Sequence, residues 1–200
     1  MSFFQTWAYL SPLVVGFGVP AALALTSGCR AGRRALAAGG VLAVDLLVLL
    51  AASLADSPRL WAPAALLLAA FALLAAGLYL ALESVRASRE VAQIGVGLVV
   101  CLLMSSMFIF GPVIRESADN GTDGPTVSRR ITLAMRVNPF FVMAYSIFQA
   151  DPLYLPVYYR TDLAGFQHEP PTWPASSAAF AAAGALLGLA GLGLRRVIPR

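Results

Sequence analysis

Lysine is absent from this chain, and all 14 of its basic residues are arginine. A P-loop needs a lysine at the nucleotide phosphates, and a Schiff base to retinal or pyridoxal phosphate needs a lysine amine, so both chemistries are excluded. His168 is the single histidine, and one histidine cannot supply bis-histidine haem ligation or a multi-histidine metal site within this chain. No nucleophile–base pair stands out either. The sequence therefore predicts a protein that is not an enzyme and has neither a cofactor nor a metal site.

Charged residues are also scarce, at 12% of 200 residues compared with about 25% in ordinary soluble domains, whereas 59% are hydrophobic. A soluble core of this size cannot bury that surplus, so the composition predicts an integral membrane protein surrounded by lipid. The arginines behind the net charge of +4 are spread along the chain, which argues against a nucleic-acid partner. The arginine-only, alanine-rich style is typical of a high-GC bacterium. We therefore expect a bacterial inner (cytoplasmic) membrane location.

Five segments are close to the length of about 20 residues that a membrane-spanning helix needs. The predicted fold is all-α, with transmembrane helices over 7–27, 35–55, 60–82, 91–114 and 174–194. The expected organisation is a four-helix transmembrane region (1–114), an extracytoplasmic loop with one or two short helices (115–173), and a final transmembrane helix with a basic cytoplasmic tail (174–200).

Arginines in the short connections predict the direction of these helices. They gather in the link at 28–34, in the link at 83–90 and in the tail at 195–200, whereas the first six residues have none. Basic residues favour the cytoplasmic ends of spans, so we expect these three ends inside. The amino terminus is then outside, the carboxy terminus is cytoplasmic, and the long loop is outside.

Residues 137–150 are nearly all apolar although they lie in the polar loop. Ten to fourteen apolar residues are too few for a span and favour an interfacial or re-entrant segment. Asn138 can cap a helix, and Pro139 fits a first helical turn. We predict a short helix over 139–150 that either lies on the membrane or dips into it and returns. A second, more amphipathic short helix is predicted over 127–136.

Several short patterns follow one another in the second half of the chain. They are the link Arg86-Ala-Ser-Arg89 before a span that ends in Gly111-Pro112, then Val137-Asn-Pro-Phe140, Trp173 before the last span, and the basic tail. Mainly through residues 83–200, the chain thereby resembles type-2 ABC transporter permeases, which carry paired short helices between their last two spans. Its five predicted spans are similar to the carboxy-terminal five-span portion of such a permease. Such permeases usually have six spans with both ends inside. Five spans that begin outside equal that plan without its first helix, as in a truncated, split or divergent permease.

The resemblance implies an exporter in which this chain forms the translocation path with a second permease subunit, in a homo- or heterodimer, and is driven by separate ATPase subunits. It implies ATPase contacts in the cytoplasmic links, namely Arg30, Arg33, Arg34, Glu83, Arg86 and Arg89. It also implies an outer gate helix with Asn138, Pro139, Phe140, Phe141, Tyr145 and Phe148. Topology anchoring alone also accounts for the arginines, and interfacial packing alone accounts for the apolar helix.

Asp45 lies near the middle of the second predicted span. An intramembrane carboxylate is costly, so a role on a substrate path, with a cation or with a proton is one hypothesis. A second is a structural partner on a neighbouring helix, such as Gln93, Ser105 or Ser106. A third is that the carboxyl group is simply protonated, because burial disfavours its charged form. We count Gln93 as a second intramembrane polar residue.

Two spacings predict helix contacts. Arg86 can pair with Glu83 and Glu90 along one helix face. Gly184 and Gly188 have the small-residue spacing that lets two helices approach closely, either inside the chain or across a dimer.

The alternative function is a non-catalytic membrane subunit of a larger respiratory or photosynthetic complex. In that case the helices would be packing and lipid-facing surface, and the outer loop would be a docking element. No charged track in the predicted spans indicates a transported substrate.

Overall fold

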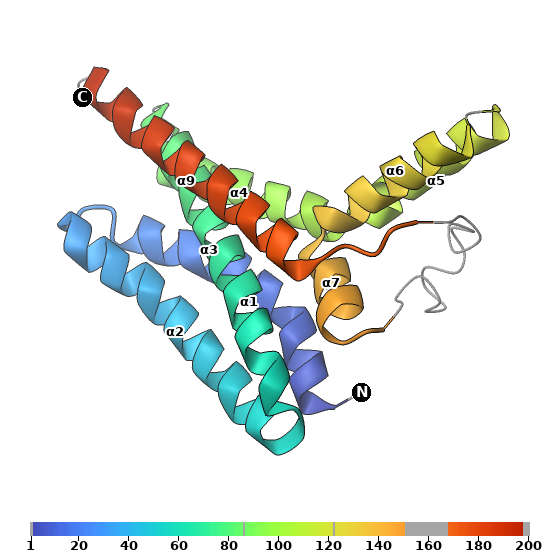
Figure 1. Ribbon diagram of the computed structural model, residues 1–200. Helices are drawn as coiled ribbons and strands as arrows, with labels where there is room; N and C mark the ends of the chain where they lie inside the picture. The colour runs from blue at the N-terminus through green and yellow to red at the C-terminus, as the bar shows by residue number, and fades with distance from the viewer. Residues whose placement is uncertain (1, 86, 122, 151–167, 198–200) are drawn as a thin grey trace. The chain divides into compact units, whose positions relative to one another are not determined.

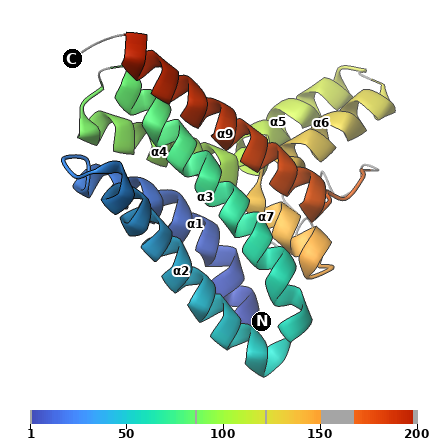
Figure 2. The same cartoon turned by 60° about the vertical axis from the view of Figure 1, so that its left-hand side comes forward.

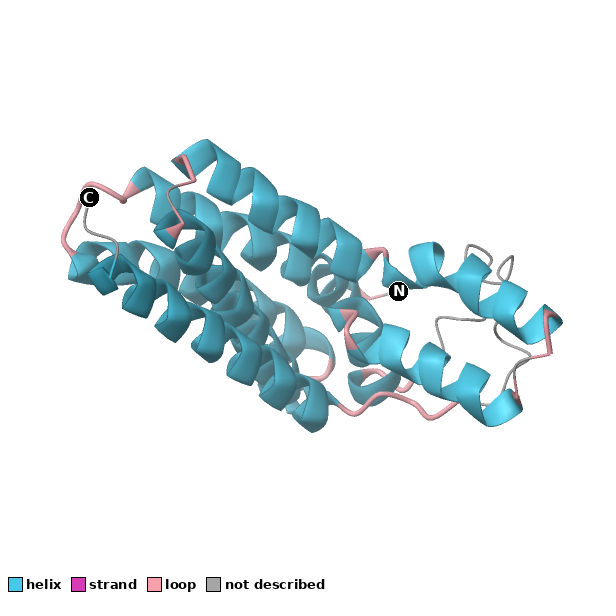
Figure 3. Cartoon of the chain, turned by 90° about the horizontal axis from the view of Figure 1, so that it is seen from above, coloured by secondary structure: helices cyan, strands magenta, loops and turns pink. Residues whose placement is uncertain are grey.

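The computed structural model describes residues 2–85, 87–121, 123–150 and 168–197, with the side chains of 195–197 excepted. Regular structure in these residues is helical throughout, without a strand (Figure 3). Along the chain the elements are α1 (Phe3–Leu25), α2 (Ala31–Asp56), η1 (Pro58–Leu60), α3 (Trp61–Ser84), α4 (Arg89–Met104), α5 (Ser106–Asp119), α6 (Gly124–Arg136), α7 (Pro139–Val142), the π-helical turn η2 (Met143–Ile147) and α9 (Trp173–Val197). The predicted all-α class is confirmed.

Four helices of the described chain are long and apolar enough to cross a membrane: α1, α2, α3 with η1, and α9. α4 and α5 meet the same requirement only as a pair, with a bend of 53° at the break between them. The number of candidate spans is therefore four, or five if the bent pair is one span.

The predicted span over 91–114 is wrong as a single continuous helix. α4 ends at Met104 and α5 begins at Ser106. α5 then runs on to Asp119, and Pro112 lies inside it rather than at its end. A break in an apolar helix frees a backbone carbonyl, which must find another hydrogen-bond donor. That donor is the side-chain amide of Asn138, the residue directly before α7.

The described residues group into two compact units, one formed by 1–100 with 177–200 and the other by 101–176. In the first unit, α1 packs against both α2 and α3 (Figure 1). Its core contains Val15 of α1, Leu49 of α2 and Phe71 of α3, all buried. Pro12 and Pro20 lie inside α1 without ending it.

α9 lies along α3 at backbone contact distance (Figures 1 and 2). A Cβ atom added at Gly184 would lie 2.5 Å from the carbonyl of Leu73, and one at Gly191 would lie 2.8 Å from the carbonyl oxygen of Leu80. Gly77 of α3 faces the backbone of Gly184 in the same way. The glycine spacing of the last helix therefore serves packing inside the chain, which was one of its two predicted uses.

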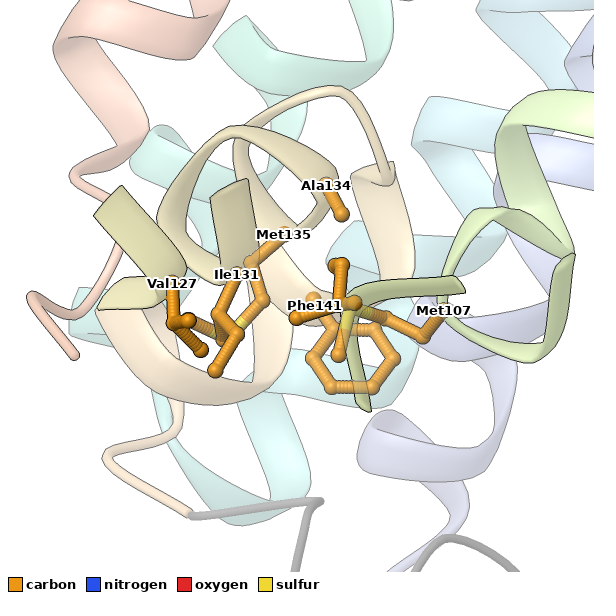
Figure 4. Close-up of a cluster of buried hydrophobic side chains, with 7 residues drawn as sticks. Met107, Val127, Ile131, Ala134, Met135 and Phe141 are labelled. Carbon is orange, nitrogen blue, oxygen red and sulfur yellow. The ribbon is translucent and has the colours of Figure 1, made fainter. Parts of the chain in front are cut away.

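The second unit has its own hydrophobic core, to which α5, α6 and α7 all contribute (Figure 4). α6 contains the short helix predicted over 127–136 and begins three residues earlier, with Pro125 in its first turn. Its apolar face packs against α5 and against the Phe141 ring. The core residues are Met107, Ile114, Val127, Ile131, Ala134, Met135 and Phe141.

Candidate functional site

Asn138 and Pro139 begin α7 as predicted. The Asn138 side-chain oxygen accepts hydrogen bonds from the backbone N–H groups of Phe140 at 3.0 Å and Phe141 at 3.4 Å. Pro139 occupies the first helical position, where its missing N–H removes no helix hydrogen bond. Both residues are buried, so this cap is part of the protein interior.

The nitrogen of the Asn138 side-chain amide binds both sides of the break between α4 and α5. This Nδ2 atom donates to the carbonyl of Met104 at 2.8 Å and to the Ser106 hydroxyl at 3.3 Å. The Ser106 hydroxyl in turn donates to the carbonyl of Ala134, at 3.0 Å. The Asn138 side chain is thus fully buried and uses its oxygen and its nitrogen. It connects the end of α4, the start of α5, the last turns of α6 and the start of α7.

The rest of the apolar stretch is packed against protein. Phe141 is fully buried, and Phe140, Tyr145 and Phe148 are partly buried. The predicted helix over 139–150 is wrong at its carboxyl end, because the α-helix gives way to the π-helical turn η2 and the helical backbone ends at Ile147. Gln149 then takes a left-handed backbone conformation, with φ of 52°, which is incompatible with continuing the right-handed helix.

The π-helical turn also connects to the start of α9. The Ser146 hydroxyl accepts a hydrogen bond from the backbone N–H of Trp173 at 2.8 Å, which satisfies one of the free amides at that helix start. The Tyr145 hydroxyl lies 3.1 Å from Nε2 of His168. The short helices are therefore hydrogen-bonded to the end of α4 on one side and to the start of α9 on the other.

The residues predicted as ATPase contacts divide into two kinds. Arg30, Arg33 and Arg89 are exposed, as a contact surface requires. Arg34 and Glu83 instead form an ion pair at 2.8 Å, with side chains only 12% and 5% exposed, which connects the start of α2 to the end of α3. Arg34 and Glu83 therefore already contact each other within this chain, and a partner protein is not needed to explain their charges.

Some predicted residues lie outside the part of the chain that the structure describes. Arg86 is one, so its predicted pairing with Glu83 and Glu90 stays a prediction. The side chains of Arg195 and Arg196, and all of Arg200, are others.

Asp45 is buried, with 2% of its surface exposed. Its Oδ1 accepts hydrogen bonds from the Trp7 indole N–H at 3.1 Å and from the Ser11 hydroxyl at 3.1 Å. The predicted partners are therefore wrong. Gln93 is exposed and lies in the second turn of α4, where it lines a groove with Arg89 and with Leu25 at the end of α1, so it is not a partner of Asp45.

The partners of Asp45 were missed although the sequence contains a signal for them. α1 and α2 form an antiparallel hairpin, in which residues equally distant from the link lie opposite each other. Ser11 precedes Gly28 by 17 residues (28 − 11), and Asp45 follows it by 17 (45 − 28). The short link between the helices therefore predicts that Ser11 is the polar residue level with Asp45.

Comparison with known proteins yields no match to this chain among protein-family models, curated proteins or solved structures. The resemblance to type-2 ABC transporter permeases rests on the residues quoted above and stays a prediction.

Proposed function

We propose that this chain is the membrane-spanning permease subunit of an ABC-type exporter. In this proposal it pairs with a second permease subunit, binds separate ATPase subunits at its arginine-bearing links, and lies in a bacterial cytoplasmic membrane with those links inside. ATP binding to the partner subunits would shift the pair between inward-open and outward-open states. α7 and η2 would form the outer gate.

The observation that carries the proposal is the arrangement of α6, α7 and η2. Paired short helices between the last two spans are the feature that led to the resemblance. Here they have a hydrophobic core in common with α5 and partly buried hydrogen bonds to Met104 and Trp173, at the ends of the flanking helices. A gate has to respond to movement of the spans, and these bonds would transmit such movement to it.

The proposed ATPase contacts are supported by the positions of the links at 28–34 and 83–90. The Arg34–Glu83 ion pair brings the link before α2 close to the end of α3. A groove lined by Leu25, Arg89 and Gln93 brings the end of α1 close to the start of α4. Arg30, Arg33 and Arg89 therefore belong to one end of the first unit, where they offer exposed positive charge to a partner protein.

The proposal is tested by isolating the protein from its native membrane in a mild detergent and identifying stoichiometric partners by mass spectrometry. We expect an ATPase subunit with a Walker A lysine. The double variant Arg33→Ala/Arg89→Ala should release it. The matched control is Arg59→Ala/Arg129→Ala, which removes two exposed arginines elsewhere and should leave the ATPase bound.

Purification with haem- or pigment-bearing subunits and no ATPase would contradict the exporter function and would favour the alternative of a subunit in a respiratory or photosynthetic complex. Equal release of the ATPase by the two double variants would contradict the placement of its contacts at these links, because general charge would then hold it.

A further inference from the structure

One face of α6 presents two arginines and two hydroxyl groups in a single groove. Arg129 and Arg136 are seven residues apart (136 − 129), which places them two helical turns from each other on the same face. Ser128 and Thr132 line the groove with them, and its volume is about 580 Å³. Both arginines are exposed. This polar groove therefore offers two guanidinium groups to an anion.

Among the described residues that line the polar groove, Glu169 alone is acidic. Its carboxylate lies 3.6 Å from the Arg136 guanidinium, and the two side chains are 82% and 48% exposed. An exposed ion pair at this distance is weak, because water screens both charges. An anion can therefore take the place of Glu169 at Arg136 at little cost, and it gains the Arg129 guanidinium as well.

A second groove runs between α5 and α6, which lie side by side (Figures 1 and 2). Its volume is about 640 Å³, and its described lining is apolar apart from Arg130. Phe110 and Val113 of α5 and Leu133 of α6 contribute to this lining although they are 49%, 57% and 62% exposed. Large apolar side chains that stay exposed in one patch indicate a surface for an apolar ligand.

Leu133 lines both grooves. Successive residues of a helix are rotated by about 100°, so Leu133 stands between Arg129 and Val137 on the surface of α6. The two guanidinium groups are thus on one side of Leu133, and the apolar groove is on the other. Of the described residues that line the two grooves, three are basic and one is acidic, which gives a net charge of +2 (3 − 1).

Two adjacent grooves of this kind match an anionic lipid. Guanidinium groups bind phosphate through parallel hydrogen bonds, and an acyl chain covers apolar side chains that water would otherwise contact. A soluble anion would use only the polar groove, and an uncharged lipid would use only the apolar one. We propose that α5 and α6 bind an anionic phospholipid, with its phosphate at Arg129 and Arg136 and one acyl chain in the apolar groove beyond Leu133.

Both grooves are formed by residues of the second unit, and the links at 28–34 and 83–90 take no part in them. The lipid site therefore does not rest on the exporter function. Lipid binding is measured on the purified chain without any ATPase. A failure of lipid binding would leave the exporter function standing, and the absence of an ATPase partner would leave the lipid site standing.

The probe is dioleoyl phosphatidylglycerol, whose headgroup is anionic. Native mass spectrometry of the full chain in a non-ionic detergent counts the bound lipid molecules as the lipid concentration rises. We expect one saturable site. Its affinity should be about tenfold higher than that for dioleoyl phosphatidylcholine, because the choline group of that lipid cancels the phosphate charge.

The double variant Arg129→Gln/Arg136→Gln removes both guanidinium groups at exposed positions, so the fold should not change. Its affinity for phosphatidylglycerol should fall about tenfold, whereas phosphatidylcholine binding should stay as it was. The matched control is Arg30→Gln/Arg33→Gln, which removes two exposed arginines of the first unit and should bind like the original chain.

The variant Glu169→Gln should change binding in the opposite direction, which loss of structure would not do. It releases Arg136 from its exposed ion pair, so the affinity for phosphatidylglycerol should rise about threefold. Glu116→Gln is the control, because it removes an exposed glutamate of α5 that lines neither groove.

A further pair of variants tests the acyl chain. Val113→Gln places a polar side chain in the apolar groove and should weaken phosphatidylglycerol binding about threefold. Ile109→Gln makes the same kind of change on α5, at an exposed position that does not line the groove, and should leave binding unchanged.

Glycerol 3-phosphate distinguishes a lipid site from a site for free phosphate, because it has the phosphate group and no acyl chain. At a concentration equal to that of the lipid, it should leave phosphatidylglycerol bound. Displacement at that concentration would overturn the lipid site in favour of a soluble phosphate ligand. Equal affinity for the two lipids would also overturn it, as would equal losses in the two arginine double variants or weaker binding by Glu169→Gln.

Discussion

Substitution of Asn138 by alanine removes two functions of one buried side chain. It removes the cap on the amides of Phe140 and Phe141, which costs about 1 kcal/mol. It also leaves the Met104 carbonyl at the helix break without its side-chain donor, which costs about 1–3 kcal/mol when that oxygen stays buried. We therefore expect Asn138→Ala to lower the free energy of unfolding by about 2–4 kcal/mol.

The assay is reversible unfolding in mixed micelles with increasing dodecyl sulfate, together with hydrogen exchange of individual backbone amides. The amides of Phe140 and Phe141 should exchange at least tenfold faster in the variant, whereas those of α3 should keep their rates. Ser2→Ala is a matched control, because Ser2 caps α1 through the amide of Gln5 near the surface and bonds to no broken helix. It should cost about 1 kcal/mol. If Asn138→Ala costs no more than Ser2→Ala and exchange at α7 is unchanged, the coupling between α7 and the helix break is refuted.

Two further substitutions test the packing of the first unit. Gly184→Ala places a methyl group against the α3 backbone and should cost about 1–3 kcal/mol in the same unfolding assay. In Gly193→Ala the added methyl group meets nothing within 4 Å, so this substitution should be neutral or slightly stabilising. Equal effects of the two substitutions would mean that α9 does not lie against α3 as described. Arg34→Ala removes the guanidinium that lies 2.8 Å from the buried Glu83 carboxylate and should cost about 3 kcal/mol in the same assay. Arg33→Ala, at an exposed position, should change stability by less than about 0.5 kcal/mol. A similar effect of both substitutions would show that the ion pair contributes nothing to stability.

Interactions between residues close together in the sequence could be predicted, whereas interactions between distant residues could not, and Asn138 takes part in both kinds. Its role as a helix cap involves amides two and three residues away, so the Asn-Pro pair was enough to predict it. Its bond to Met104 spans 34 residues and depends on a helix break at Ser105. The break falls at the Ser105-Ser106 pair, but two serines in an apolar run are also compatible with an unbroken helix, so they did not by themselves predict the break.

Charged residues show the same limit. The helical spacing of Glu83 and Arg86 predicted a local pair, which stays a prediction, but nothing in the spacing indicated the buried ion pair of Glu83 with Arg34, which is 49 residues away on another helix. Asp45 was identified as unusual because a carboxylate in an apolar helix is costly wherever it points. Its neighbours depend on how α1 and α2 pair. Predicting them requires the length of the link between the two helices as well as the apolar pattern.

The pairing of α3 with α9 also has a consequence for biosynthesis. Gly77 and Gly184 are 107 residues apart (184 − 77), and the whole of the unit over 101–176 is translated between them. While the ribosome makes that unit, the face of α3 at Gly77 is not yet covered by α9, and small residues on a helix face allow another helix of suitable shape to approach closely. Insertion of the last helix therefore ends a period in which the nascent chain is open to mispairing. The first part of the protein to be synthesised is thus the last to be completed.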